Sequence, residues 1–164
     1  MRRTLCVLPS IALLLVAVVV PLAANAESTA VTERAIVKVA FNKKLKSSIL
    51  VDSRGMTLYM WSDDVGGTPT CYNDPRYHCA KAWPPLLTTG APRAGQGVRA
   101  SLLGVVRRTG GKSQVTYKQH PLYTNAGSPT FGLIADKKPG DVNGQNFSGW
   151  YVLTPKGTPI TRTP

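Results

Sequence analysis

The apolar residues of this chain come in short runs rich in β-branched and aromatic residues, and Gly- or Pro-rich stretches separate the runs. Such runs, with side chains alternating at period two, predict strands, whereas no segment shows a convincing helical period. Gly110-Gly111 predicts a hairpin turn, and Asp52 and Gly55 suit the first and last positions of another turn. The sequence therefore predicts an all-β domain. Its strands are expected at 35–42, 48–52, 56–62, 101–107, 114–118, 121–125 and 150–154.

The expected strand at 56–62 carries apolar side chains on both of its faces. Tyr59 and Trp61 fall on one face, and Leu58 and Met60 fall on the other. Because successive side chains of a strand point to opposite sides, a strand apolar on both sides has to be covered on both sides. We therefore expect residues 56–62 to lie centrally in the fold.

Residues 1–26 have the pattern of a secretory signal peptide. Met1-Arg2-Arg3 is a short positive start, residues 11–20 are an unbroken apolar run, and Ala24-Asn25-Ala26 supplies the small residues of a cleavage site. The alternative is an uncleaved membrane anchor, for which the apolar run is short. The sequence predicts export by the general secretory route and a mature chain that begins at Glu27.

Export sets expectations for the rest of the chain. Cys6 precedes the apolar run, whereas a lipid-accepting cysteine follows it, so we expect a protein without a lipid anchor that is not an integral membrane protein after cleavage. Residues 27–34 are polar and read as a flexible lead-in. Residues 35–164 are long enough for a single domain with a real core.

The chain is strongly basic, with 20 Lys and Arg against 8 Asp and Glu. Loss of Arg2 and Arg3 with the signal lowers the formal charge from +12 to +10. Such a charge favours an anionic partner, which outside the cytoplasm means an envelope polymer, lipid headgroups or an acidic protein, and not nucleic acid. The alternative is a solvated surface that serves solubility. Lys43, Lys44 and Lys46 form the densest cluster.

Two cysteines remain after cleavage, Cys71 and Cys79. An even number of cysteines in an exported domain favours a disulfide, which here closes a nine-residue loop. The alternative is a metal site that combines the two cysteines with His78 and His120, although the spacing fits no standard zinc pattern.

A weak internal repeat appears when two Leu-Tyr pairs are aligned. Leu58-Tyr59 matches Leu122-Tyr123, and a tryptophan follows each pair at a similar distance, Trp83 in the first unit and Trp150 in the second. Each unit reads as a hairpin, a long loop, and a tryptophan with a short apolar run. Two such units, at about 35–97 and 98–164, would bury their apolar faces against each other as a pseudo-two-fold sandwich or barrel. Trp83 and Trp150 are then expected to be equivalent and buried.

The first unit resembles a bacterial family of secreted repeats of unknown function, also described as predicted lipoproteins with a Tyr-x-aromatic-x-x-Asp motif. Tyr59, Trp61 and Asp64 supply that motif here. The cysteine pair followed by Trp83-Pro84-Pro85-Leu86 also matches, although the gap between Cys71 and Cys79 is longer than is usual in the family.

The second unit resembles the family over a series of short motifs and departs from it at the acidic position. Asn125 and Ser128 stand where the motif has an aromatic residue and Asp. The resemblance implies export and a repeat, and it implies no reaction. The matching motifs are Val115-Thr116-Tyr117, Pro121-Leu122-Tyr123, Gly144-Gln145 and Trp150-Tyr151-Val152.

The sequence offers few groups for catalysis. The chain has two histidines and no nucleophile-elbow or zinc-helix motif, so we predict a non-enzymatic exported module with no catalytic residues, no cofactor and no metal site. A metal- or redox-handling accessory protein is the alternative. His120, near Tyr123, would be its ligand, with help from Met56 or Met60.

The motif residues themselves have two interpretations. Tyr59 and Trp61, with the Asp64 carboxylate, could stack on a sugar or enclose a cation. Alternatively, the aromatic rings pack in the core and Asp64 caps the next turn. The candidate ligand-binding or structural residues are Tyr59, Trp61, Asp64, Trp83, His120, Tyr123 and Trp150.

Overall fold

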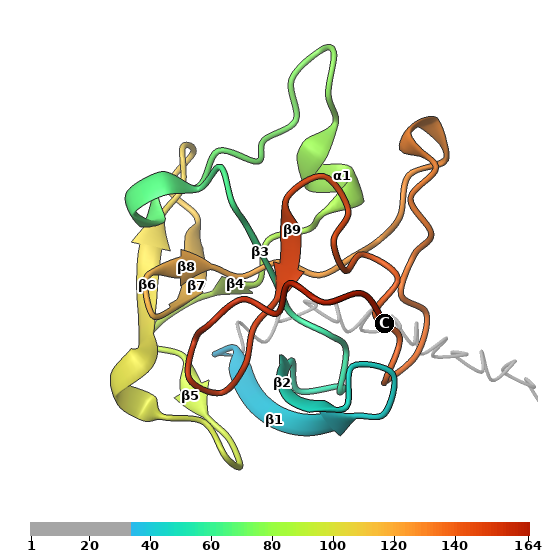
Figure 1. The fold of residues 1–164 in the computed structure, drawn as a ribbon. Helices are drawn as coiled ribbons and strands as arrows, with labels where there is room; N and C mark the ends of the chain where they lie inside the picture. Colours follow the sequence, from blue (N-terminus) through green and yellow to red (C-terminus); the bar gives the residue numbers. More distant parts are fainter. Residues whose placement is uncertain (1–33) are drawn as a thin grey trace, which may run out of the picture. The chain divides into compact units, whose positions relative to one another are not determined.

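The described chain opens with a hairpin in which β1 (Ile36–Asn42) pairs antiparallel with β2 (Ser47–Val51) (Figure 1). The computed structural model describes residues 34–164. The predicted signal peptide at 1–26 and all of the lead-in except Arg34 lie outside the described residues. The short strand β5 (Arg93–Ala94) adds to β1 in parallel, giving the order β2-β1-β5.

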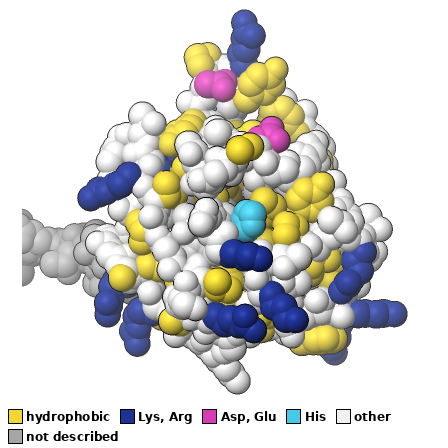
Figure 2. Space-filling view, turned by 60° about the vertical axis from the view of Figure 1, so that its left-hand side comes forward, with side chains coloured by type: hydrophobic (Ala, Val, Ile, Leu, Met, Phe, Trp, Pro, Cys, Tyr) yellow, Lys and Arg dark blue, Asp and Glu magenta, His cyan; other side chains and the backbone are white. Residues whose placement is uncertain are grey.

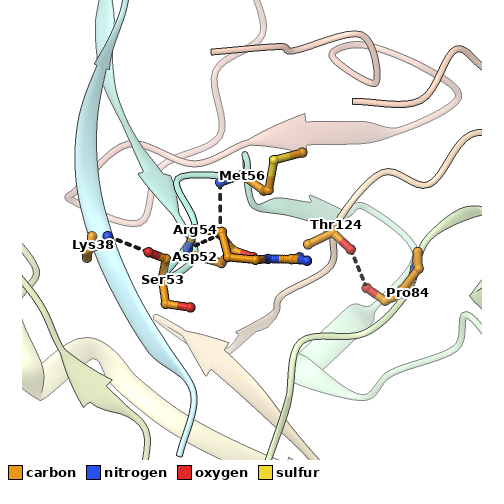
Figure 3. Close-up of polar contacts among 7 residues, drawn as sticks. All are labelled: Lys38, Asp52, Ser53, Arg54, Met56, Pro84 and Thr124. Atoms are coloured by element: carbon orange, nitrogen blue, oxygen red, sulfur yellow. Dashed lines mark hydrogen bonds and ion pairs between the residues drawn. The ribbon is translucent and has the colours of Figure 1, made fainter. Parts of the chain in front are cut away.

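The predicted turn after β2 is present and is held by Asp52. Its buried carboxylate accepts the main-chain N–H of Arg54 and of Met56, both at 2.9 Å (Figure 3). Gly55 has a φ of 85°, a left-handed conformation that glycine adopts without strain. Lys38 on β1 donates to the carbonyl of Ser53 at 2.6 Å, which ties the turn to the neighbouring strand.

A second hairpin has the same position in the second half of the chain. β6 (Leu103–Arg107) pairs antiparallel with β7 (Ser113–Tyr117) around the predicted Gly110-Gly111 turn. β4 (Leu87–Thr88) and β8 (His120–Pro121) both pair with β7, so this sheet has the order β4-β7-β6 with β8 joined to β7.

A two-stranded ladder at the centre joins the two halves of the sequence. β3 (Tyr59–Trp61) pairs antiparallel with β9 (Trp150–Val152), close to 90 residues later (Figure 1). β3 is shorter than the predicted strand at 56–62. Its residues are buried or half-buried, as expected for a central strand.

Two hydrophobic clusters pack on either side of β3. Tyr59 is buried in one cluster with Trp61 packed against it, whereas Leu58 and Met60 are buried in the other. The predicted assignment of these side chains to opposite faces is therefore confirmed. Every buried side-chain nitrogen or oxygen in the described residues has a hydrogen-bond partner.

Helical structure in the described residues is limited to single turns. α1 (Cys79–Ala82) is a four-residue helix in the region expected to be loop, and η1 (Val65–Gly67), η2 (Ala100–Leu102) and η3 (Pro129–Phe131) are 3₁₀ turns. Within residues 34–164, no helix is long and apolar enough to cross a membrane. The fold is mostly strands, and its sheets are not closed into a barrel.

Candidate functional site

The two motif tyrosines meet at the centre of the fold. Tyr59 and Tyr123 form an antiparallel bridge, in which the N–H of each donates to the carbonyl of the other at 2.9 Å. The Tyr59 hydroxyl donates to Asp136 at 2.6 Å, and the Tyr123 hydroxyl donates to Asp64 at 2.7 Å. Each tyrosine of one unit is therefore hydrogen bonded to a carboxylate of the other unit.

Both carboxylates also organise the loops that carry them. Asp64 accepts hydrogen bonds from the main-chain N–H and the hydroxyl of Thr70, at 2.7 and 2.8 Å. Asp136 accepts the N–H of Asn143 at 2.8 Å. Because both side chains are buried and their oxygens are engaged, they hold the fold together and are not presented to a ligand.

Burial sets the protonation of these groups. Desolvation raises the pKa of the Tyr59 hydroxyl far above its ordinary value, and the Asp136 carboxylate raises it further. Tyr123 has a raised pKa for the same reason, with Asp64 as its acceptor. Both tyrosines therefore remain hydrogen-bond donors throughout the physiological range. Burial also raises the pKa of Asp136, against the hydrogen bonds from Tyr59 and Asn143 that lower it.

The three tryptophans form a stack beside the tyrosines. The rings of Trp83 and Trp150 lie face to face, with centroids 4.0 Å apart and planes within 6°, and Trp61 stacks on Trp150 at 5.2 Å. Trp83 and Trp150 are each 3% exposed, so the predicted burial of both is confirmed. Tyr59 meets Trp83 edge-on at 5.2 Å, and Tyr123 meets Trp150 edge-on at 5.0 Å.

An apolar cleft of about 360 Å³ opens beside this stack. Its wall combines the tryptophans with the disulfide-bonded Cys79 and with Ser148, and Trp61 donates its indole N–H to the Ser148 carbonyl at 3.3 Å. Such a wall can bury a flat apolar group but offers few polar anchors. The further aromatic lining residues are Tyr77, Phe131 and Phe147.

The cysteines are joined to each other, as predicted. Cys71 and Cys79 form a disulfide with their Cα atoms 5.3 Å apart, which removes both thiolates from any metal site with His78 and His120. In residues 34–164, no group of three or more His, Cys, Asp or Glu is placed to hold a metal ion. His120 lies on β8, where burial and the nearby Lys118 lower its pKa. Met60 is buried in the core.

A model of the family described as a secreted repeat of unknown function matches the chain over residues 44–87 and 104–154. The chain belongs to this family. No curated protein and no solved structure matches it. Membership confirms the resemblance and supports a location outside the cytoplasm.

The two family repeats occupy matching places in the fold. Tyr59 pairs with Val152 on β9, and in the same way Tyr123 forms a bridge with Pro85, two residues after Trp83. The tyrosine segment of each repeat therefore pairs with the tryptophan segment of the other repeat. The division into units at 35–97 and 98–164 stays a prediction, but the pairing means that the repeats do not form separate lobes.

The second repeat lacks the motif's Asp at Ser128, and the structure places its counterpart to Asp64 further along the sequence. The carboxylate that hydrogen bonds to Tyr59 is Asp136, which lies 13 residues after Tyr123, whereas Asp64 lies five residues after Tyr59. An intervening loop that carries η3 displaces it along the sequence. Because Asp136 lies farther from its tyrosine than the motif spacing requires, the motif did not identify it. Only an alignment that allowed a gap could have found it.

A second cleft, of about 460 Å³, lies where the β1–β2 turn meets the loop at 137–141. Lys43 and Lys44 of the predicted basic cluster line it, whereas Lys46 does not. Lys138, about 95 residues later, completes the basic lining. Nothing in the sequence gives a reason to place Lys138 beside the first cluster.

The sequence also gave no indication that Arg108 is buried and has a structural role. Its guanidinium donates to Gln114 and to the Cys71 carbonyl, and it lies 4.2 Å from the ring centroid of Tyr72. It therefore anchors the start of the disulfide loop to the β6–β7 hairpin. Nothing in the sequence distinguishes Arg107, which is exposed, from the adjacent Arg108, which is buried.

Proposed function

We propose that this protein is a non-enzymatic extracellular module that binds an anionic partner through its basic surface. The observation that carries the proposal is an imbalance of accessible charge. Asp52, Asp64 and Asp136 are buried and hydrogen bonded, so their charges do not face the surrounding solvent. Almost all of the described Lys and Arg side chains, by contrast, lie at the surface.

The surface cations are largely unneutralised by the protein itself. In the described part of the chain, one salt bridge forms, between Arg54 and Asp52 at 3.0 Å. Figure 2 shows dark-blue Lys and Arg side chains over much of the lower half of one face, with Asp visible only near the top. A field of one sign over a surface draws oppositely charged partners toward it.

The absence of catalysis is part of the same proposal. The side chains that the fold brings together, Tyr59 with Asp136 and Tyr123 with Asp64, are buried and use their hydrogen bonds on one another. Cys71 and Cys79 are consumed by the disulfide. These arrangements support a structural role for the motif residues of the repeat, and they leave the surface as the place where a partner would bind.

The test is binding of the secreted protein to a soluble polyanion, inorganic polyphosphate, at two salt concentrations. The Debye length is about 10 Å at 0.1 M and about 3 Å at 1 M, so binding at the lower concentration should be lost at the higher one. Uncharged dextran is the control. The absence of binding to polyphosphate at 0.1 M salt, or binding unchanged at 1 M, would contradict the proposal.

A further inference from the structure

The cleft between the β1–β2 turn and the loop at 137–141 combines positive charge with exposed apolar surface. Lys43, Lys44 and Lys138 line it, and the apolar side chains of Ile49 and Val51 form part of its wall. Phe41 also lines the cleft and is 67% exposed. Phe41 is among the most exposed large apolar side chains of the described residues, and it shares this cleft with three lysines.

The walls of this cleft are held together by hydrogen bonds. Asn42 accepts the N–H of Leu45 at 2.9 Å and donates to the Gly140 carbonyl at 3.1 Å, so one side chain shapes the turn and joins it to the loop. Thr57 donates to the Asp141 carbonyl at 2.6 Å. The lysines are therefore presented from a preformed surface.

One carboxylate, Asp141, lines the same cleft. It accepts the main-chain N–H groups of Lys137 and Lys138 at 3.0 and 3.2 Å. Both hydrogen bonds reach the same oxygen, Oδ2, and the charges of Lys138 and Lys44 also help to lower the pKa of this carboxyl group. No ion pair joins Asp141 to a lysine in the described residues. Lys43, Lys44 and Lys138 outnumber this one carboxylate, so the cleft remains net positive.

The geometry points to an anionic phospholipid membrane as the partner of this cleft, an inference that rests on the proposed function. Lysines next to a protruding aromatic side chain suit an interface, where the cations meet phosphate headgroups and the ring enters the acyl boundary. A soluble polyanion would satisfy the lysines but would leave Phe41 in water. The exposed ring therefore decides between these two sources of anionic groups.

The test measures co-sedimentation of the secreted protein with phosphatidylglycerol–phosphatidylcholine vesicles at 0.1 M salt. The double variant Lys43→Gln/Lys44→Gln should lower the partition coefficient by about 25-fold, taking about fivefold for each lysine near an anionic surface. Its matched control is Lys81→Gln/Lys112→Gln. Both control residues are exposed, and neither lines the cleft. Lys81 lies on α1, which is at the opposite end of Figure 1 from the β1–β2 hairpin.

The apolar contribution is tested separately with Phe41→Ser. This variant keeps every charge and should weaken vesicle binding by about tenfold, which corresponds to partial loss of a buried phenyl ring. It should leave binding to polyphosphate unchanged. Val65→Ser is the control, since Val65 is 78% exposed and lies outside the cleft.

The outcomes separate this inference from the proposed function. Binding to polyphosphate without binding to vesicles would overturn the membrane inference and leave the proposed function standing. Equal losses in the two lysine double variants, or equal binding to pure phosphatidylcholine vesicles, would also overturn it. Failure to bind polyphosphate at 0.1 M salt would remove the proposed function itself, and with it the membrane inference that rests on it.

Discussion

Tyr59 and Tyr123 exchange two main-chain hydrogen bonds at 2.9 Å, and each donates its hydroxyl to a carboxylate that belongs to the other repeat. The repeated sequence therefore builds one core with crossed partners. The arrangement explains why a family motif that contains Tyr and Asp need not mark a ligand site. The side chains of these residues form the hydrogen bonds that join the two repeats.

Replacing Tyr59 with Phe is expected to lower the free energy of unfolding by about 1–3 kcal/mol, because it removes the donor to the buried Asp136 carboxylate. Urea unfolding measures the change. Tyr77→Phe is the control, since Tyr77 is exposed, and should lie within about 0.5 kcal/mol of wild type. If adding Asp136→Asn to Tyr59→Phe gave a fully additive loss, the two side chains would not be coupled as the structure indicates.

Replacing Gly144 with Ala tests the contact beneath the tryptophan stack. The new methyl group would overlap the Trp83 ring, with Cζ3 only 2.8 Å away, so we expect a loss of about 1–3 kcal/mol. Gly90→Ala is the matched control, because its nearest neighbour is at an ordinary 3.5 Å. Neither glycine has a positive φ, so the comparison isolates packing. Equal thermal stability of the two variants would contradict the close packing of Trp83.

The disulfide should contribute about 2–3 kcal/mol, as expected for a short closed loop. A Cys71→Ala/Cys79→Ala variant should show this loss in urea unfolding. Adding a reductant should destabilise the wild-type protein and leave the variant unchanged. Labelling of both cysteines by a thiol reagent in unreduced, unfolded protein would be incompatible with the bond.

The buried Asp136 carboxyl makes a pH-dependent contribution to stability. Its folded-state pKa is raised, principally by burial, above the ordinary value of 3.8. As pH rises from below 3.8 to above the folded-state pKa, the unfolded chain releases its proton first, so this group's contribution to the free energy of unfolding falls. The free energy of unfolding of wild type minus that of Asp136→Asn should therefore fall over that interval. A shift in favour of wild type would contradict the raised pKa.

The mature N-terminus stays a prediction, because residues 1–33 lie outside the described structure. The Ala24-Asn25-Ala26 site predicts that secreted protein begins at Glu27. Intact-mass measurement of protein from the culture medium tests this directly. A mass that retained residues 1–26 would show that the segment is not removed.

The sequence by itself determined the features that depend on neighbouring residues. Alternation along residues 56–62 placed Tyr59 and Leu58 on opposite faces, and Asp52 with Gly55 specified a turn, because side-chain direction and turn conformation are local properties of the backbone. The disulfide followed from cysteine number and export. The alignment of Trp83 with Trp150 followed from the repeat, since each unit has to bury the same apolar pattern.

Only the tertiary structure decided which repeat supplies each partner. The pairing of β3 with β9 and the hydrogen bond from Tyr59 to Asp136 depend on how the two repeats pack against each other. No local sequence pattern specifies which residues of one repeat contact which residues of the other. The same closure brings Lys138 beside Lys43, because a cleft between distant loops exists only after the chain has folded. The packing of the whole chain therefore decides which side chains are buried and which charges face the solvent, whereas the local sequence decides where strands and turns form.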